Sequence, residues 1–585
     1  MKSLEKLTSD VLECYYANNC SVEQWEVIKD NLFAIEQIDA FAKFPSADIL
    51  RLKTIYDGSY EECKASSGAH YKTNYCYLIL SMGKNIKLAI CVPKSCGRED
   101  ITRMFNKISQ IPLIACDAYC TDYAIEKDST FWALNAFLGI TIAIVLISTI
   151  TCIRHFLIIP EYLNAFSLWT NSNKLLIVRD HKNGVIQSLD CIRFFSLSWV
   201  IAGHCTTIFG FSDTILPIAD VPKNLLNHLI IGGTFAVDTI TPPMIMTIWF
   251  FIVYAPYIRG PAAAVAMNQH LMEAETCRRK WWKNLLYINN FGNLMDLCYA
   301  PSWYMSVDTQ LYFVAPIFII ALSISRKFGC ILLGTIGVIS IAIVHILFAT
   351  YDLPVDVIGK GDFLKFFVKI YIKPWIRCPP YLIGVFVGYV LARIQPQRIT
   401  KRIPLIVLGW SVAVSIALTC IFITYQYDKG EQNWSAFTRA TYYNLSRIFW
   451  SMSVAWVIVA NSIGWGGPIK NFMSHPIWQP FGRLSYCAYI VHWMVILYFV
   501  NIGDRPLHLV SLWQVYVYYA IPVTVLTFLL AFILSCLYEM PTSRLESIFW
   551  KNIESAETKA RFEWAVENQR KNLYYNRDVF YINKL

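Results

Sequence analysis

An arginine and a histidine lie in an apolar stretch at positions 188–205, SLDCIRFFSLSWVIAGHC. Arg193 is near the start of the stretch and His204 is near its end. Eleven positions of α-helix give about 16 Å of rise and about three turns, so the two side chains share one face. Imidazole can take a proton from a hydroxyl as a general base, and guanidinium can hold phosphates bidentately. The pair therefore suits group transfer from a phosphate-bearing donor to a hydroxyl.

Each of the two residues also has a structural interpretation. Arg193 could be an interfacial side chain that reaches the aqueous boundary. His204 could hydrogen-bond to a neighbouring helix as part of the packing. Ionisable groups inside membrane spans usually mark a site or a pathway, however, and the shared face of this pair favours function.

The elements that must position the pair are transmembrane helices. Hydrophobic residues make up 56% of the 585 residues and charged residues 16%, and several uncharged runs reach the length of about 20 residues that a span requires. We predict an all-α polytopic membrane protein with about ten transmembrane helices. The apolar segments are 131–153, 192–212, 229–258, 304–325, 329–350, 380–392, 403–424, 448–466, 484–502 and 512–538.

The first 130 residues are polar and contain an even number of cysteines, which indicates a disulfide framework outside the cytosol. A zinc site is less favoured, because the closest spacings are C-x4-C and C-x3-C and His70 is the histidine nearby. The pairing cannot be deduced from sequence. The candidate cysteines are Cys14, Cys20, Cys63, Cys76, Cys91, Cys96, Cys116 and Cys120, together with Cys277 and Cys298 in a later loop.

The chain begins MKSLEKLTSDVLECYY, which has no apolar core of a signal peptide. We therefore expect a signal peptide upstream of this sequence. In the alternative, the segment 131–153 acts as a reverse anchor. Asn19 and Asn433 lie in sequons and are candidate glycosylation sites. Asn444 also lies in a sequon, but close to the membrane.

Basic residues in short loops beside helix ends account for the formal charge of +10, as the positive-inside rule predicts, so no nucleic-acid partner is expected. With residues 1–130 luminal and the C-terminal tail cytosolic, both ends of the segment 229–258 would be luminal, so the segment would have to cross the membrane an even number of times. That run is broken by Pro242-Pro243 and is too short for two spans. The basic residues 278–283 also oppose the luminal side assigned to their loop.

The sequence resembles the nose resistant to fluoxetine proteins of invertebrates, within the acyltransferase family three superfamily. The resemblance covers nearly the whole chain. Its segments include AIEQIDAFAKFPSADIL (34–50), CVPKSC (91–96), SLDCIRFFSLSWVIAGH (188–204), CYAPSWYMSVDTQLY (298–312), PPYLIGVFVGYVLA (379–392) and RLSYCAYIVH (483–492).

This resemblance implies that Arg193 and His204 are the catalytic signature, an arginine and a histidine separated by ten residues. It implies acyl transfer from cytosolic acyl-CoA to a hydroxyl-bearing lipid or small molecule, without a metal, in the plasma membrane or the endoplasmic reticulum. The expected domains are a cysteine-rich luminal or extracellular domain (1–130), a first transmembrane helix (131–153), a cytosolic linker (154–187), an acyltransferase-like transmembrane domain (188–540) and a cytosolic tail (541–585).

One departure from similar proteins concerns Asp238-Thr239-Ile240, which runs directly into Thr241-Pro242-Pro243. In similar proteins a helix and a basic loop separate these two motifs. The resemblance thus implies that one membrane crossing is missing. This agrees with the odd number of crossings that the segment 229–258 leaves. A loss of this helix would put catalytic activity in question.

Further polar residues are candidates for supporting roles. The resemblance implies that Asp238 lies near His204 and orients its ring, with a helix-entry role as the alternative. Asp308 and Gln310, after Trp303 and Tyr304, begin a span and could bind the acceptor; interhelical hydrogen bonding is the alternative for them. We expect Asp190 to cap its helix, and His345 and His492 to be structural.

Three functions follow from these observations. The first is a membrane O-acyltransferase that uses His204 as base and Arg193 to hold acyl-CoA. The second is a lipid or small-molecule carrier that retains the same fold without catalysis. The third is a receptor-like surface protein that acts through the cysteine-rich domain.

Overall fold

The computed structural model describes most of the chain between residues 36 and 553. Cys14, Cys20, Asn19, Asp238 and the junction at 240–241 lie outside the described residues, so the predictions for them stay predictions. The described residues are 36–43, 50, 52–67, 72–81, 85–108, 114–154, 160–178, 186–209, 213, 227, 242–293, 296–355, 362–394, 400 and 402–553.

The N-terminal domain is built on a four-stranded sheet in the order β1-β3-β2-β4. The central strand β2 is antiparallel to β3 and β4, and β1 is parallel to β3. Because both faces of β2 are covered, its residues 74–80 are buried without alternation. The elements are β1 (Ile55–Tyr56), α3 (Tyr60–Ala65), β2 (Thr73–Ser81), β3 (Asn85–Pro93), α4 (Arg98–Ile108) and β4 (Ile114–Cys120).

Three disulfides join six of the candidate cysteines. Cys63–Cys91 links α3 to β3, Cys76–Cys120 links residues directly opposite on β2 and β4, and Cys277–Cys298 lies in the membrane unit.

The structure does not pair the two other described candidates of the N-terminal domain, Cys96 and Cys116. Cys116 lies where the β2–β4 register shifts, between the pairs Ile79–Asp117 and Leu80–Ala115, so no residue of β2 is opposite it and its side chain is exposed.

Removal of the Cys277–Cys298 disulfide is expected to destabilise the membrane unit. This bond closes a loop of 21 residues between buried cysteines, for which loop entropy predicts about 3 kcal/mol. Cys277→Ser should therefore lower the unfolding temperature in detergent. Cys330→Ser, which removes an exposed free cysteine, serves as control, and an equal unfolding temperature for the two variants would contradict the prediction.

The membrane unit is helical, which confirms the predicted fold class. Among the described residues, eight helices are long and apolar enough to cross a membrane, or up to nine if α20 and α21, bent by 91°, form one span. The spans are α5 (Ser129–Arg154), α8 (Ser188–Ile208), α14 (Ser302–Ile324), α15 (Arg326–Tyr351), α17 (Pro374–Ile394), α18 (Ile403–Phe422) continued by α19 (Tyr425–Lys429), α22 (Trp478–Asn501) and the run Leu512–Ile553, with α20 (Ala436–Ser462) and α21 (Gly467–Met473) as the bent pair.

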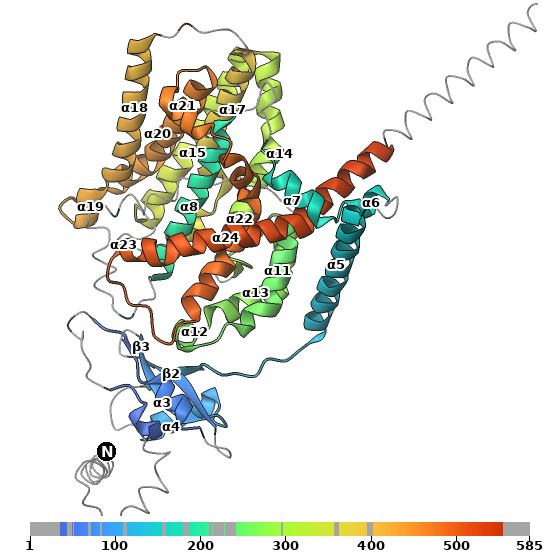
Figure 1. Cartoon of the computed structure of the whole chain (residues 1–585). Coiled ribbons are helices and arrows are strands. Elements are labelled where there is room, and N and C mark those ends of the chain that lie inside the picture. Colours follow the sequence, from blue (N-terminus) through green and yellow to red (C-terminus); the bar gives the residue numbers. More distant parts are fainter. Residues whose placement is uncertain are drawn as a thin grey trace, which may run out of the picture.

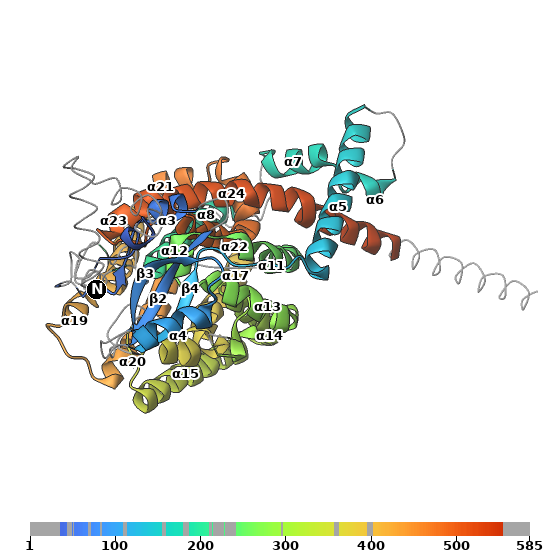
Figure 2. The same ribbon diagram turned by 90° about the horizontal axis from the view of Figure 1, so that it is seen from below.

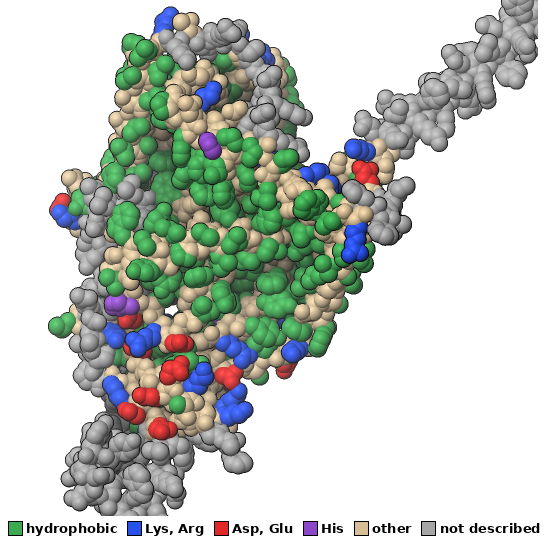
Figure 3. Space-filling view, viewed as in Figure 1, with side chains coloured by type: hydrophobic (Ala, Val, Ile, Leu, Met, Phe, Trp, Pro, Cys, Tyr) green, Lys and Arg blue, Asp and Glu red, His purple; other side chains and the backbone are tan. Residues whose placement is uncertain are grey.

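The run from Leu512 is one long helix with two π-helical turns. It consists of α23 (Leu512–Val515), η10 (Tyr516–Ala520), α24 (Ile521–Leu534) and η11 (Ser535–Glu539), and it continues as α-helix to Ile553. Two short helices, α6 (Glu161–Asn164) and α7 (Leu168–Leu176), follow α5. Hydrophobic side chains cover the visible face of the membrane unit, whereas acidic and basic side chains gather at its lower end and on the N-terminal domain (Figure 3).

The predicted segment 229–258 contains one described helix, α11 (Pro242–Tyr254). Its 13 residues amount to about 20 Å, which is shorter than a span. A short helical turn, η6 (Ala255–Tyr257), connects it to α12 (Pro261–Val265), which lies directly above the N-terminal domain (Figure 1). A full span at 229–258 is thus absent from the described residues.

The N-terminal domain is docked on this connection. Tyr123 donates to the Pro256 carbonyl at 2.7 Å, Lys87 donates to the Val265 carbonyl at 2.7 Å, and Arg259 pairs with Asp122 at 2.8 Å. Seen from below, β2, β3 and β4 lie across α12 (Figure 2), and α12 completes the core under the sheet. The domain and the membrane unit therefore share a packed interface.

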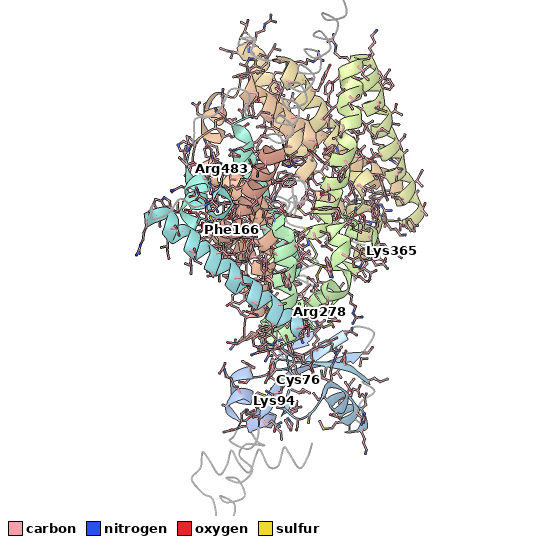
Figure 4. The ribbon with its side chains drawn as sticks, turned by 90° about the vertical axis from the view of Figure 1, so that its right-hand side faces the viewer. Cys76, Lys94, Phe166, Arg278, Lys365 and Arg483 are labelled. Carbon is pink, nitrogen blue, oxygen red and sulfur yellow. A yellow bond between two sulfur atoms is a disulfide. The ribbon has the colours of Figure 1, made fainter. Side chains whose placement is uncertain are left out.

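Three of the four basic residues of α13 (Gln269–Leu285) pair with carboxylates. Arg278 pairs with Asp128 just before α5, near the junction with the N-terminal domain (Figure 4). Arg279 pairs with Glu275 at 2.9 Å, and Lys280 pairs with Asp296. These ion pairs explain how a basic stretch can lie on the side where the N-terminal domain sits.

Gly482 allows α8 and α22 to approach each other closely. A Cβ at Gly482 would lie 2.6 Å from the Cβ and Cγ of Asp190, so Gly482→Ala should push the two helices apart and cost about 1–3 kcal/mol. Gly334→Ala on α15 adds a Cβ in open space and is the matched control. Thermal unfolding of both variants checks the prediction, which fails if Gly482→Ala unfolds with the control.

Candidate functional site

His204 and His492 form a pair between two neighbouring spans. The Nδ1 atom of His204 lies 2.8 Å from the Nε2 atom of His492, and the two rings are inclined by 9°. His204 belongs to α8 and His492 to α22, and these helices start side by side, where Asp190 lies against Gly482. His492 is completely buried and His204 is half-buried, so the predicted base is the more accessible of the two.

A backbone carbonyl sets the proton positions of the pair. Nδ1 of His492 is hydrogen-bonded to the carbonyl oxygen of Tyr489, which can only accept. Neutral His492 therefore carries its proton on Nδ1, and its Nε2 accepts a hydrogen bond from the Nδ1–H group of His204. The remaining nitrogen of His204, Nε2, then holds a free lone pair, which is the state that a general base needs.

Aromatic and acidic residues hold the other side of His204. The Trp493 and His204 rings meet edge-on with their centres 5.7 Å apart. The indole N–H of Trp493 donates to Glu273 at 3.1 Å. Gln269 donates to the second carboxylate oxygen of Glu273 at 3.0 Å. Burial raises the pKa of Glu273, on α13, to about 7. Thus α13 fixes the tryptophan that packs against the candidate base.

Arg193 lies at the start of α8, away from the histidine pair. Its side chain is 50% exposed, and its Nη1 atom is 3.9 Å from Asp190. Asp190 lies in the first helical turn, whereas Gln187 occupies the N-cap position, so the expected capping role of Asp190 is wrong. Arg193 thus has the exposure required to contact a ligand from outside the bundle.

The candidates of α14 separate into two groups. The ring centre of Tyr304 lies 6.0 Å from that of Tyr489, which precedes His492 by three positions. The ring centre of Trp303 lies 5.1 Å from that of Tyr371. Gln310 instead exchanges two hydrogen bonds with Asn290, at 2.9 and 3.1 Å. The structure thus brings Tyr304 near the histidine pair and places Gln310 in an interhelical contact.

Sequence reasoning treated His492 as structural and did not consider Tyr489, Trp493 or Glu273. The available signal was a histidine in an apolar span, since such groups usually mark sites. The other intramembrane histidine, His345, contacts Ile341 and Thr441 and is part of the packing between α15 and α20. Within the described residues, no group of three His, Cys, Asp or Glu residues could hold a metal ion.

Two family models match parts of the chain. Residues 242–536 match the family described as acyltransferase domain, and residues 24–105 match the nose resistant-to-fluoxetine protein, N-terminal domain. The first match begins after α8, so it includes His492 but not Arg193 or His204.

Two curated proteins of Caenorhabditis elegans are similar to this chain. Nose resistant to fluoxetine protein 6 is 22% identical over 82% of this chain and 68% of its own length. Regulator of hypoxia-inducible factor 1 is 23% identical over 66% of this chain and 84% of its own length. No solved structure matches the chain.

Proposed function

We propose, since the chain belongs to the acyltransferase-domain family, that it moves an acyl group from acyl-CoA to a hydroxyl-bearing lipid or small molecule, with His204 as the general base. The observation that carries this proposal is the hydrogen-bonded series His204, His492 and the Tyr489 carbonyl. It leaves a basic nitrogen on a half-buried side chain inside an integral membrane protein.

In the proposed reaction, Nε2 of His204 takes the proton of the acceptor hydroxyl. The hydroxyl oxygen attacks the thioester carbonyl, a C–O bond forms, and the C–S bond breaks. The proton passes from His204 to the departing thiolate, which yields CoA and returns His204 to its neutral state. Throughout, the bond to His492 keeps the ring of His204 in one orientation.

Arg193 would hold the phosphates of the donor. Its exposed guanidinium can bind phosphate oxygens bidentately. The two residues are separated by about 16 Å along α8, which suits a donor whose thioester is distant from its phosphates. Basic Arg154 and Lys174 on the same side support a cytosolic location for this end of α8.

The N-terminal domain would then face the lumen or the extracellular space, in the endoplasmic reticulum or the plasma membrane. Its two disulfides support this side, since such bonds persist in oxidising compartments. Asn433 is exposed between α19 and α20, as glycosylation requires, whereas Asn444 is buried and bonded to Ile341. We propose Asn433 as the modified site of these two.

A turnover assay tests the catalytic function. Purified full-length chain in lipid nanodiscs would receive labelled acyl-CoA and a total lipid extract as acceptor, and chromatography would measure free CoA and labelled product. We expect both to accumulate over many turnovers, and heat-treated protein is the control. Stoichiometric binding of acyl-CoA or lipid without release of CoA would reject the enzyme and support the carrier.

A further inference from the structure

A glutamate that the mechanism does not use lies one aromatic ring away from the candidate base. Glu273, on α13, accepts the indole N–H of Trp493 at 3.1 Å. The ring centres of Trp493 and His204 are 5.7 Å apart, and Trp493 directly follows His492 in α22. Glu273 thus holds the ring that packs against His204.

The helix that carries Glu273 is not among the candidate spans. It lies at the end of the bundle that faces the N-terminal domain (Figure 1). The Cys277–Cys298 disulfide ties it to the segment before α14, and Arg278 pairs with Asp128 just before α5. These two links fix α13 independently of the spans that carry the histidines.

A second contact joins the same unit to α22. Tyr299 follows Cys298 in the chain, and its hydroxyl donates to the carbonyl oxygen of Ile490, two positions before His492. Cys277 is four positions after Glu273, so the two side chains share a face of α13. The disulfide therefore joins two side chains, Glu273 and Tyr299, that both hold α22 beside His492.

The backbone around α13 is strained. Met267 and Asn268, directly before the helix, have φ angles of 58° and 49°, and Tyr299 has a φ angle of 59°. Left-handed conformations are costly for residues other than glycine, and they persist where the surrounding structure demands them, often at functional sites. The chain therefore keeps α13 in place against a local cost.

The carboxyl group of Glu273 ionises near neutral pH. Burial raises its pKa to about 7, and the hydrogen bonds from Trp493 and Gln269 oppose this rise. An ionised carboxylate accepts both bonds in their stronger, charge-assisted form. A neutral carboxyl group carries a proton on one of the two oxygens and accepts more weakly. The hold on Trp493 should therefore strengthen as the pH rises through about 7.

The charged groups around Glu273 leave this ionisation to the carboxyl group itself. Burial lowers the pKa of His270, three positions earlier on α13, to about 4, so that ring is neutral near pH 7. The basic residues 278–280 pair with other carboxylates. The helix α11, which packs against α13, contains no charged residue. Tyr299 is uncharged at this pH, and the histidine pair lies across Trp493.

We propose that Glu273 is a positioning residue of the acyl-transfer site, which holds the Trp493 ring against His204 and thereby sets the orientation of the base. Glu273 does not touch the reacting atoms in this role. The proposal rests on the acyl-transfer function for its effect on the rate. The hold on His204 can be measured without catalysis.

The kinetic test uses full-length protein in nanodiscs with labelled acyl-CoA. Glu273→Ala should lower kcat by about 10–100-fold with little change in KM, because small displacements of a catalytic group have effects of this size. Glu273→Gln should stay within about fivefold of the wild type, since its amide oxygen can accept the indole N–H. Glu275→Gln, at a 54% exposed position on the same helix, is the matched control and should keep the wild-type rate. A wild-type rate in Glu273→Ala would overturn the proposal.

The pH–rate profile separates positioning from packing. In the wild type the rate should rise through about pH 7 with the titration of Glu273 and of the histidine pair. Glu273→Gln removes one of these ionisations, so its profile should rise less steeply. An unchanged profile in Glu273→Gln would mean a structural role alone and would contradict the proposal.

A double variant tests the route through the tryptophan. Trp493→Phe keeps an aromatic ring but lacks the N–H group, so it should lose rate as Glu273→Ala does. Because the two residues act as one unit, the double variant should be little slower than either single variant. Losses that multiply would show two independent effects and would exclude this route. If Glu273→Ala does not fold, Trp493→Phe provides the same comparison with the wild type.

Chemical labelling provides a readout without catalysis. Diethyl pyrocarbonate modifies neutral imidazole, and mass spectrometry would compare the labelling of His204 with that of the exposed His475 as an internal reference. His204 should be labelled faster in Glu273→Ala and in Trp493→Phe than in the wild type and in Glu275→Gln. If turnover is absent and this difference remains, the acyl-transfer function fails and the positioning role stands. Wild-type turnover with equal labelling in all variants would overturn the positioning role alone.

Discussion

Replacement of His204 with alanine is expected to lower the rate of acyl transfer by about 10²–10⁴-fold, the contribution typical of a positioned general base. The residue is half-buried, and its ring is hydrogen-bonded to His492, so its removal should leave the fold intact. The transfer rate with labelled acyl-CoA and the unfolding temperature, measured on the same preparation, check both parts of this expectation.

His345→Ala is the matched control for this variant, since it also removes a hydrogen-bonded histidine from a membrane span. That variant should lower the unfolding temperature and leave the rate per folded molecule unchanged. If His204→Ala transferred acyl groups at the wild-type rate, His204 would not be the general base.

The second large effect is expected at His492. In His492→Phe the ring of His204 has no acceptor for its Nδ1 proton, so His204 can adopt the other tautomer and lose the lone pair on Nε2. We expect a loss of rate of about 10²-fold or more, as found when the orienting partner of a catalytic histidine is replaced. His492→Gln should stay within about tenfold of the wild type, because its amide oxygen can accept the same proton.

Two further measurements separate positioning from simple packing at His492. Tyr489→Phe should keep most of the activity, because its backbone carbonyl rather than its hydroxyl accepts from His492. The pH–rate profile of the wild type should reflect two coupled imidazoles and that of His492→Gln a single one. Equal rates for the phenylalanine and glutamine variants would show that His492 only fills space.

The sequence predicted those features that depend on local pattern. Runs of about 20 apolar residues indicate spans wherever they occur, and α8 was expected within a few residues of its actual bounds, Ser188–Ile208. The shared face of Arg193 and His204 follows from helical periodicity alone. The even number of cysteines similarly indicated disulfides before any pairing was known.

Features that depend on distant contacts could not be predicted. His492 is 288 positions from His204, and only the packing of α8 against α22 makes it a partner. The pairing Cys76–Cys120 likewise requires the register of β2 and β4. The strand β2 was missed because burial on both faces removes the alternation that identifies a strand.

Within the described residues, eight or nine helices qualify as spans by length and composition, and two segments show what hydropathy alone does not decide. The apolar run at 229–258 contains Pro242-Pro243, and the helix described there is the 13-residue α11. The helix α20 is followed after a short break by α21 at 91°, so length alone does not decide whether the pair crosses. Hydropathy measures the polarity of a segment and carries no information on its direction.

The composition of the histidine pair also has a consequence for the timing of proton transfer. Within the described residues, neither His204 nor His492 is in an ion pair with a carboxylate, unlike the histidine of a serine hydrolase. An imidazolium formed before the thioester reacts would have no fixed counter-charge in a medium of low polarity. A concerted step, in which negative charge develops on the thioester as the proton arrives, avoids this isolated cation. The pair should therefore favour acceptors whose deprotonation and attack occur together over acceptors that ionise first.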